Sequence, residues 1–134
     1  MGKAANPLDR ESYIETVESY FMALDERRIV DVLAYFNKDA TFIVQSAFLS
    51  YLGRDTDIKG MFEGFLDTYK IILHTDFEHI VDPFSHSISS RFRVELDDTN
   101  GIHDTKQSVN HWYFHNGKFQ RVYVWISGDN VLGD

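Results

Sequence analysis

Apolar side chains recur at helical spacing in the first quarter of the chain. They lie three or four residues apart, at Ile14, Val17, Phe21 and Leu24. This spacing predicts an amphipathic helix of about four turns. Its start is expected at Asn6 and Pro7 or at Asp9, or at a capping box that opens with Ser12. After the polar residues 25–28, a shorter apolar group predicts a second, short helix that ends at residues 37–39.

The next stretch predicts a strand and a third helix. Residues 41–45 are β-branched and apolar, which favours a strand, and residues 46–53 lack a clean period and are expected to form a loop over apolar side chains. Asp55 or Thr56 can cap a helix whose broad apolar stripe runs to Tyr69. Gly60 and Gly64 lie one turn apart inside it. Each costs roughly 1 kcal/mol relative to alanine, so we expect a neighbouring element to approach closely there.

Alternation of apolar and polar residues predicts four strands in the second half of the chain. The first two cover residues 71–82 and 87–96, and the last two lie within residues 104–127. Asn116 and Gly117 join the last pair, and both residues accept the positive φ of a two-residue hairpin turn. Bulky side chains occupy both faces of this hairpin, so one face is expected to meet helices and the other a partner subunit or the rest of the sheet.

Helices followed by antiparallel strands are the element order of an α+β fold, in which helices cover one face of a curved sheet. A chain of 134 residues is long enough for one domain with its own core. We therefore predict a single domain over residues 1–134, with residues 1–9 and 128–134 loosely ordered.

Charge and cysteine content narrow the possible partners. Asp and Glu number 21 against 13 Lys and Arg, and the resulting net charge of −8 disfavours nucleic acid and anionic membranes. The absence of cysteine excludes thiolate chemistry and allows a reducing compartment. No apolar run approaches the roughly 18 residues of a membrane span, and no signal-peptide core is present, so a cytoplasmic location is expected.

The histidines are the first candidates for metal or acid–base chemistry. His111 and His115 are four residues apart, which on a strand separates them by roughly 13 Å, too far for a shared metal ion. No metal site is therefore expected. His79, His86 and His103 fall on or beside predicted turns and strands, where a solvated or core-edge histidine is the simpler interpretation.

The order of elements and several short motifs resemble the nuclear transport factor 2-like, or SnoaL-like, superfamily. The motifs are residues 20–25 (YFMALD), 33–42 (LAYFNKDATF) and 52–58 (LGRDTDI), with the hairpin at 109–125. The resemblance covers roughly residues 10–127. It implies a cone-shaped roll, in which a strongly bent, mainly antiparallel sheet covered by three N-terminal helices encloses an apolar pocket. This scaffold hosts isomerases, dehydratases, cyclases, epoxide hydrolases and binding modules, so it does not fix the function.

The resemblance also implies a homodimer formed through the outer face of the sheet. The bulky residues on both faces of the closing hairpin agree with this assembly. The expected interface is the sheet face that carries Val122, Val124 and His111.

Two subfamilies with known acid–base machinery match poorly. Steroid-isomerase-like members carry a proton-abstracting aspartate after the first strand, and Val44 fills that place here. Epoxide-hydrolase-like members use an arginine and an aspartate, two residues apart, on a central strand. Arg93 and Glu95 are similar to that pair, but the alternation that buries Val94 between them places both charges on the opposite face.

Scytalone-dehydratase-like members match better. They retain a histidine just after the third helix and an aspartate at the end of the first, and His74 and Asp25 occupy comparable places. Imidazole exchanges protons near neutral pH, which suits syn-elimination or cyclisation of a polyketide-like ring. Leu24 and Val44 replace two substrate-binding tyrosines of those members, so the dehydration itself stays open. A helix-end cation for His74 and a solvated helix end for Asp25 are the plainer alternatives.

Asn110 occupies a place where SnoaL-like hairpins often carry an inward-facing aspartate. A polar group there needs a buried partner, a water or a ligand. The leading hypothesis is a small enzyme of dehydratase, cyclase or isomerase type, acting on a hydrophobic, oxygenated ring compound by general acid/base chemistry without metal or organic cofactor. His74 is the expected acid/base, and Asp25 and Asn110 are expected to orient it or the substrate oxygen. The residues expected to line the pocket are Tyr20, Tyr51, Phe92, Trp112 and Tyr123.

The competing hypothesis is a non-catalytic small-ligand-binding or assembly domain of the same fold. The interior distinguishes the two. An enclosed cavity that touches His74 and Asn110 favours chemistry, whereas an interior filled by aromatic side chains favours the alternative.

Overall fold

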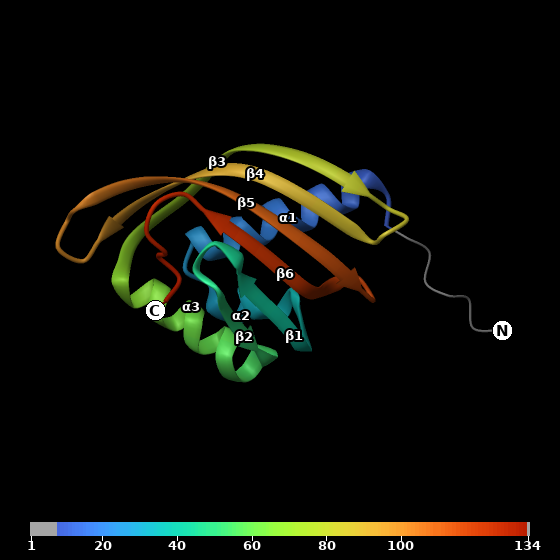
Figure 1. The fold of residues 1–134 in the computed structure, drawn as a ribbon, viewed down its shortest axis with the longest axis horizontal. Helices are drawn as coiled ribbons and strands as arrows, with labels where there is room; N and C mark the ends of the chain where they lie inside the picture. Colours follow the sequence, from blue (N-terminus) through green and yellow to red (C-terminus); the bar gives the residue numbers. More distant parts are fainter. Residues whose placement is uncertain (1–7, 134) are drawn as a thin grey trace.

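The computed structural model describes residues 8–133, and the predictions for residues 1–7 and 134 lie outside this range. Within it, two helices precede a pair of strands, and a third helix then precedes four consecutive strands (Figure 1). The elements are α1 (Arg10–Asp25), α2 (Ile29–Ala34), β1 (Phe36–Val44), β2 (Leu49–Leu52), α3 (Lys59–Thr68), β3 (Tyr69–Asp82), β4 (Ser87–Asp98), β5 (His103–His115) and β6 (Lys118–Ile126). A 3-10 turn (Gln45–Ala47) precedes β2, and a π-helical turn (Gly53–Ile58) precedes α3.

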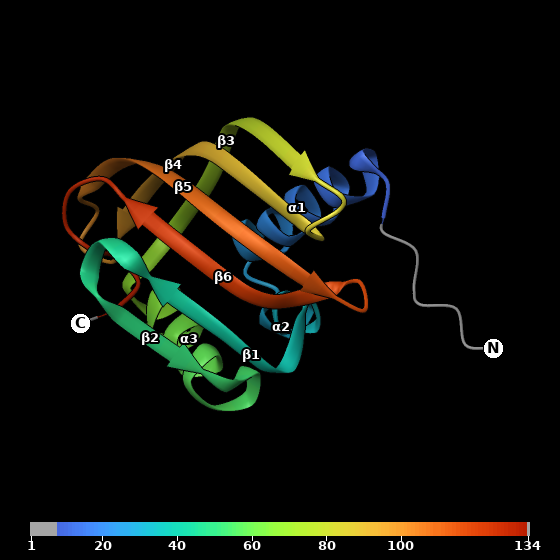
Figure 2. The same ribbon diagram turned by 45° about the vertical axis from the view of Figure 1, so that its right-hand side comes forward.

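The strands form one open, mixed sheet in the order β2-β1-β6-β5-β4-β3. Neighbours pair antiparallel except β1 and β6, which are parallel. The sheet bends strongly, and the helices lie on its concave side (Figures 1 and 2). The predicted α+β roll is therefore confirmed. Among residues 8–133, no helix is both long and apolar enough to cross a membrane.

Asp9 starts α1, which settles the choice among the predicted starts. Its side chain accepts a hydrogen bond from the backbone N–H of Ser12 at 2.8 Å, the N-cap contact that satisfies a free amide of the first turn. The buried face of the helix consists of Tyr13, Val17, Tyr20, Phe21, Ala23 and Leu24. Burying a large apolar side chain contributes roughly 1.5–3 kcal/mol, so this face anchors α1 to the sheet.

The largest differences from the sequence prediction lie between residues 37 and 58. Residues 37–39 belong to β1 rather than to the end of α2, and the predicted loop at 46–53 contains β2, which pairs with β1. Neither Asp55 nor Thr56 caps α3, because the π-helical turn replaces the cap. Asp57 instead accepts a bond from the N–H of Leu52 at 3.0 Å, which ties this turn to β2.

The closing hairpin turns at Asn116 and Gly117 with φ of 51° and 77°, as predicted. One register shift interrupts its ladder, and as a result Phe119 and Val122 both face the core. Val122 and Val124 are 0% and 2% exposed. The prediction that these valines form a dimer interface is therefore wrong, because they are already buried within one chain.

The core lies between the helices and the concave face of the sheet, with Tyr20 near its centre. The Tyr20 ring packs edge-on against Phe119 and Trp112, with centroid separations of 5.1 and 6.4 Å. Such edge-to-face pairs add to the free energy of burial. The aromatic side chains therefore fill most of the interior and leave only a small space beside α1.

Candidate functional site

A small cavity of about 40 Å³ lies inside the cone, between α1, α3 and the concave face of the sheet. Its lining is apolar except for four polar side chains, which come from α1, β3 and β5. These polar residues are Tyr20, His74, Ser108 and Asn110. A few polar groups in an apolar concavity are typical of small-molecule sites.

Asp25 and His74 form a pair at the edge of this cavity. The Asp25 Oδ1 lies 2.5 Å from His74 Nδ1, and Asp25 Oδ2 accepts the backbone N–H of His74 at 2.9 Å. Their side chains are 16% and 6% exposed. An ionised Asp25 only accepts hydrogen bonds, so this contact favours the tautomer of His74 with its proton on Nδ1. The other nitrogen, Nε2, has no hydrogen-bond partner among residues 8–133.

The positions of both residues follow from the local fold. Asp25 is the last residue of α1, and His74 lies on β3, the strand that packs beside that helix end. Phe21, one turn before Asp25, stacks on the imidazole with a centroid separation of 4.3 Å, and Phe92 contacts it at 5.4 Å. The imidazole is therefore held by a carboxylate on one edge and by aromatic rings on its faces.

Asn110 and Tyr20 supply hydrogen-bond donors to the same cavity. The Ser108 hydroxyl lies 3.1 Å from Asn110 Oδ1, so the Asn110 amide N–H groups are left without a partner among the described residues. The Tyr20 hydroxyl also has no hydrogen bond to any residue in the described range. Burial, with a smaller contribution from Asp25, raises the pKa of Tyr20 well above its ordinary value, which keeps the hydroxyl a neutral donor.

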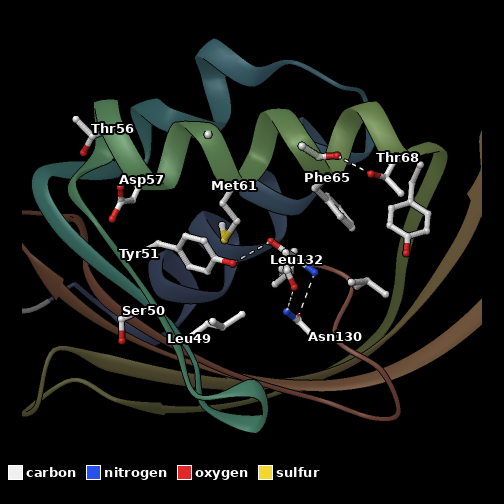
Figure 3. Close-up of a pocket in the computed structure, with 15 residues that line it drawn as sticks. Leu49, Ser50, Tyr51, Thr56, Asp57, Met61, Phe65, Thr68, Asn130 and Leu132 are labelled. Carbon is white, nitrogen blue, oxygen red and sulfur yellow. Dashed lines mark hydrogen bonds between the residues drawn. The ribbon is translucent and has the colours of Figure 1, made fainter.

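A larger groove of about 810 Å³ lies outside the cavity, between β2, α3 and residues 130–133 (Figure 3). Tyr51 reaches across it from β2, and its hydroxyl bonds the carbonyl of Leu132 at 3.3 Å. Gly60 and Gly64 face this groove, and no neighbouring atom lies within 4 Å of where a Cβ would stand. The prediction that these glycines admit a neighbouring element is therefore wrong, since open space lies beside them.

Metal binding has no evident site in the described residues. No group of three or more His, Asp or Glu side chains in that range could hold a metal ion.

Comparison with known proteins identifies the fold. No protein-family model matches the sequence, and no curated protein sequence matches it. Solved structures do match. AusH from Aspergillus nidulans superposes with a TM-score of 0.79 at 12% identity, covering 95% of this chain and 92% of that chain. A proposed SnoaL-like polyketide cyclase from Shewanella putrefaciens superposes with a TM-score of 0.75 at 12% identity, covering 89% of this chain and 91% of that chain.

A proposed isomerase from Bacillus subtilis gives a TM-score of 0.77 at 11% identity, with 87% of each chain covered. Two further neighbours are described as a nuclear transport factor 2-like protein and a proposed SnoaL-like polyketide cyclase. This chain has the SnoaL-like fold. Identities this low establish the fold alone, and they leave the chemistry to be argued from the cavity itself.

Within the SnoaL-like fold, some of the predicted site residues come together. His74, Asn110, Tyr20 and Phe92 line the cavity, and Asp25 bonds His74 at its edge. These residues come from α1, β3, β4 and β5, so only the folded chain assembles them.

The other three predicted lining residues lie elsewhere. Tyr51 lines the outer groove, and Trp112 is fully buried in the core without lining the cavity. Tyr123 is on the outer face of the sheet and stacks on Trp125 with a centroid separation of 6.5 Å. Val122 and Val124 take the inward positions on either side of it, because the register shift sets which residues of β6 face the core.

Several residues of the site were not predicted from the sequence. Ser108 lines the cavity and positions the Asn110 amide, and its alternation with Asn110 along β5 was the available signal. Val131 and Leu132 line the cavity from beyond the last strand. No periodic pattern identifies residues in such a terminal segment.

Proposed function

We propose that this protein is a small enzyme of isomerase, cyclase or dehydratase type that moves a proton on a hydrophobic, oxygenated ring compound. The observation that carries the proposal is the imidazole of His74, whose Nδ1 bonds Asp25 while Nε2 is unpartnered among the described residues. An imidazole oriented by a carboxylate is a common form of general base. The likeness of the fold to a proposed isomerase and to proposed polyketide cyclases is consistent with it.

The chemical step follows from the groups around the cavity. Nε2 of His74 takes a proton from a ring carbon next to a carbonyl, and the electron pair of the broken C–H bond moves onto the carbonyl oxygen. The Asn110 amide and the Tyr20 hydroxyl donate hydrogen bonds to that oxygen. Asp25 stabilises the imidazolium, which then returns its proton. Return of the proton to another carbon, as the carbonyl re-forms, completes an isomerisation. In a dehydration the re-forming carbonyl instead drives a C=C bond that breaks the C–O bond of a β-hydroxyl, and the imidazolium protonates that oxygen, so that water leaves.

The test compares His74→Gln with the wild type. The bicyclic ketone 2-tetralone serves as the probe, and NMR in D2O follows exchange of the protons next to its carbonyl. We expect the wild type to accelerate exchange, and His74→Gln to lower the catalysed rate by about 10² to 10⁴ with binding within a few fold. The control His115→Gln changes an exposed histidine on the hairpin and should keep the wild-type rate. A His74→Gln variant as fast as the wild type contradicts the proposal.

A second candidate is a non-catalytic ligand-binding or assembly domain. The cavity volume of about 40 Å³ favours it, because aromatic side chains occupy most of the interior. In that case ring compounds raise the melting temperature without being turned over, and His74→Gln leaves both observations unchanged.

A further inference from the structure

The C-terminal residues 128–133, here called the strap, supply an unusual part of the cavity wall. Val131 and Leu132 line the cavity, whereas its other lining residues belong to helices or strands. Strand β6 ends at Ile126, and the N–H of Ser127 still bonds the carbonyl of Gln107 at 2.9 Å. Beyond that point the strap belongs to no helix or strand.

Side-chain contacts hold the strap in place. The Tyr51 hydroxyl bonds the Leu132 carbonyl at 3.3 Å, and the Asn130 side chain bonds within the strap, to the N–H of Leu132 and the carbonyl of Gly133 (Figure 3). Val131 and Leu132 are only partly buried against the core. Segments with few buried contacts and no ladder of backbone bonds open at low free-energy cost.

The same two strap residues also line the outer groove. Together with Phe65 of α3, which also lines both spaces, the strap therefore separates a cavity of about 40 Å³ from a groove of about 810 Å³. Displacing Val131 and Leu132 would join the two spaces, and the unpartnered groups of the cavity would then face the groove.

The cavity is too small to hold a ring unless one of its walls moves. A volume of about 40 Å³ holds a few waters at most, whereas an apolar cavity that binds benzene measures about 150 Å³. We propose that the strap is the gate of this site. It swings away from the cavity and admits a ring compound from the groove side to His74. The gated compartment is the site of the proposed function, so the role of the gate in turnover rests on that function.

Access to the cavity can be measured without any substrate. The chain has no cysteine, and Ser108 lines the cavity at 5% exposure, so Ser108→Cys places one thiol inside. The probe is 5,5′-dithiobis(2-nitrobenzoic acid), an aromatic disulfide. The thiolate attacks one sulfur, forms a mixed disulfide and expels a coloured thionitrobenzoate. The labelling rate therefore reports how often the cavity opens to a ring.

Two valines of the same cavity provide the comparison. Val131 lies on the strap, and Val124 lies on β6 at 2% exposure. In the Ser108→Cys background, we expect Val131→Ala to raise the labelling rate by about 10-fold or more and Val124→Ala by less than about 3-fold. Labelling should also depend weakly on urea, because opening the strap exposes little surface.

Two results would contradict the role of the strap as a gate. If Val124→Ala speeds labelling as much as Val131→Ala, the thiol is reached by unfolding of the core. If neither substitution changes the rate, the strap does not control access. Because the assay needs no turnover, a gate that fails is distinguishable from a failure of the His74 chemistry, which His74→Gln tests separately.

Discussion

At the scale of single residues, the site depends on how one histidine is held. Nδ1 of His74 lies 2.5 Å from Oδ1 of Asp25, and the imidazole stacks on Phe21. Nε2 is therefore the nitrogen able to accept a proton. The resemblance to scytalone-dehydratase-like members, and not a local pattern, singled out His74 and Asp25, whose hydrogen bond joins residues 49 positions apart. That bond exists because β3 packs beside the end of α1, a tertiary contact that no local spacing encodes.

The buried hydroxyl of Tyr20 should make stability depend on alkaline pH. Burial raises the pKa of Tyr20 in the folded state, while an unfolded tyrosine titrates near 10. The folded state therefore binds more protons above about pH 10, so the stabilising contribution is present below that pH and is lost as pH rises through it. Between pH 8 and pH 10.5, the free energy of unfolding measured with urea should fall less for Tyr20→Phe than for the wild type. The control is Tyr123→Phe, on the outer face of the sheet. If the free energy of unfolding falls as much for Tyr20→Phe as for this control, the pH dependence does not come from Tyr20.

The sequence predicted some lining residues and missed others for physical reasons. Tyr20, Phe92 and Asn110 sit on regular helix and strand faces, so periodicity placed them correctly inside. Tyr123 was expected to line the pocket and lies outside. The register shift in the closing hairpin changes the alternation along β6, and a single sequence gives no signal for such an irregularity.

At the scale of elements, the long amphipathic helix and the long strands were predictable, and the short segments were not. β2 has only four residues, with partly exposed and exposed side chains in alternation, so its apolar pattern is weak. The π-helical turn before α3 uses Asp57 to bond β2, where a side-chain cap was expected. Both features depend on the pairing of β2 with β1, which the local sequence does not express.

Substitution of a glycine by alanine should stabilise the protein in α3 and destabilise it in the closing hairpin. Gly64 has a helical backbone and open space where a Cβ would stand, so Gly64→Ala should raise the free energy of unfolding by up to about 1 kcal/mol. Gly117 has φ of 77°, a conformation that alanine rarely adopts. Gly117→Ala should therefore lower the free energy of unfolding by about 1 kcal/mol or more. Denaturant unfolding measures both. A destabilised Gly64→Ala would mean that the groove beside α3 is not open in solution.

At the scale of the whole molecule, the outer face of the sheet carries an unpartnered aromatic patch. We define the outer patch as Val109, His111, Tyr113, Arg121, Tyr123 and Trp125. The Arg121 guanidinium stacks over Tyr113 at 4.3 Å from the ring centroid, and Trp125 is 44% exposed. Arginine and aromatic side chains are enriched in protein interfaces. We propose that this patch, in place of the buried valines, forms a homodimer interface.

The proposed dimer should dissociate in acid. Burial, and next the nearby Arg121, lower the pKa of His111, so the folded state holds this imidazole neutral. A partner that covers His111 would bury it further, so the dimer favours the neutral imidazole and association weakens as pH falls below the ordinary value near 6.5. Light scattering should give twice the 15.6 kDa chain mass at pH 7.5 and a smaller mass at pH 5. Trp125→Ser should be monomeric at both. A wild type that is monomeric at high micromolar concentration and pH 7.5 would exclude the dimer.

The state of the His74 ring tests the central claim most directly, and it needs no substrate. Nitrogen-15 NMR of the side chain, assigned by the signal lost in His74→Gln, reports which ring nitrogen carries the proton. At alkaline pH we predict a proton on Nδ1 and a bare Nε2, because Asp25 accepts from Nδ1. In Asp25→Asn the amide can donate to Nδ1, so the proton should move to Nε2. A wild-type ring protonated on Nε2, or one that Asp25→Asn leaves unchanged, would contradict the assignment of His74 as the base.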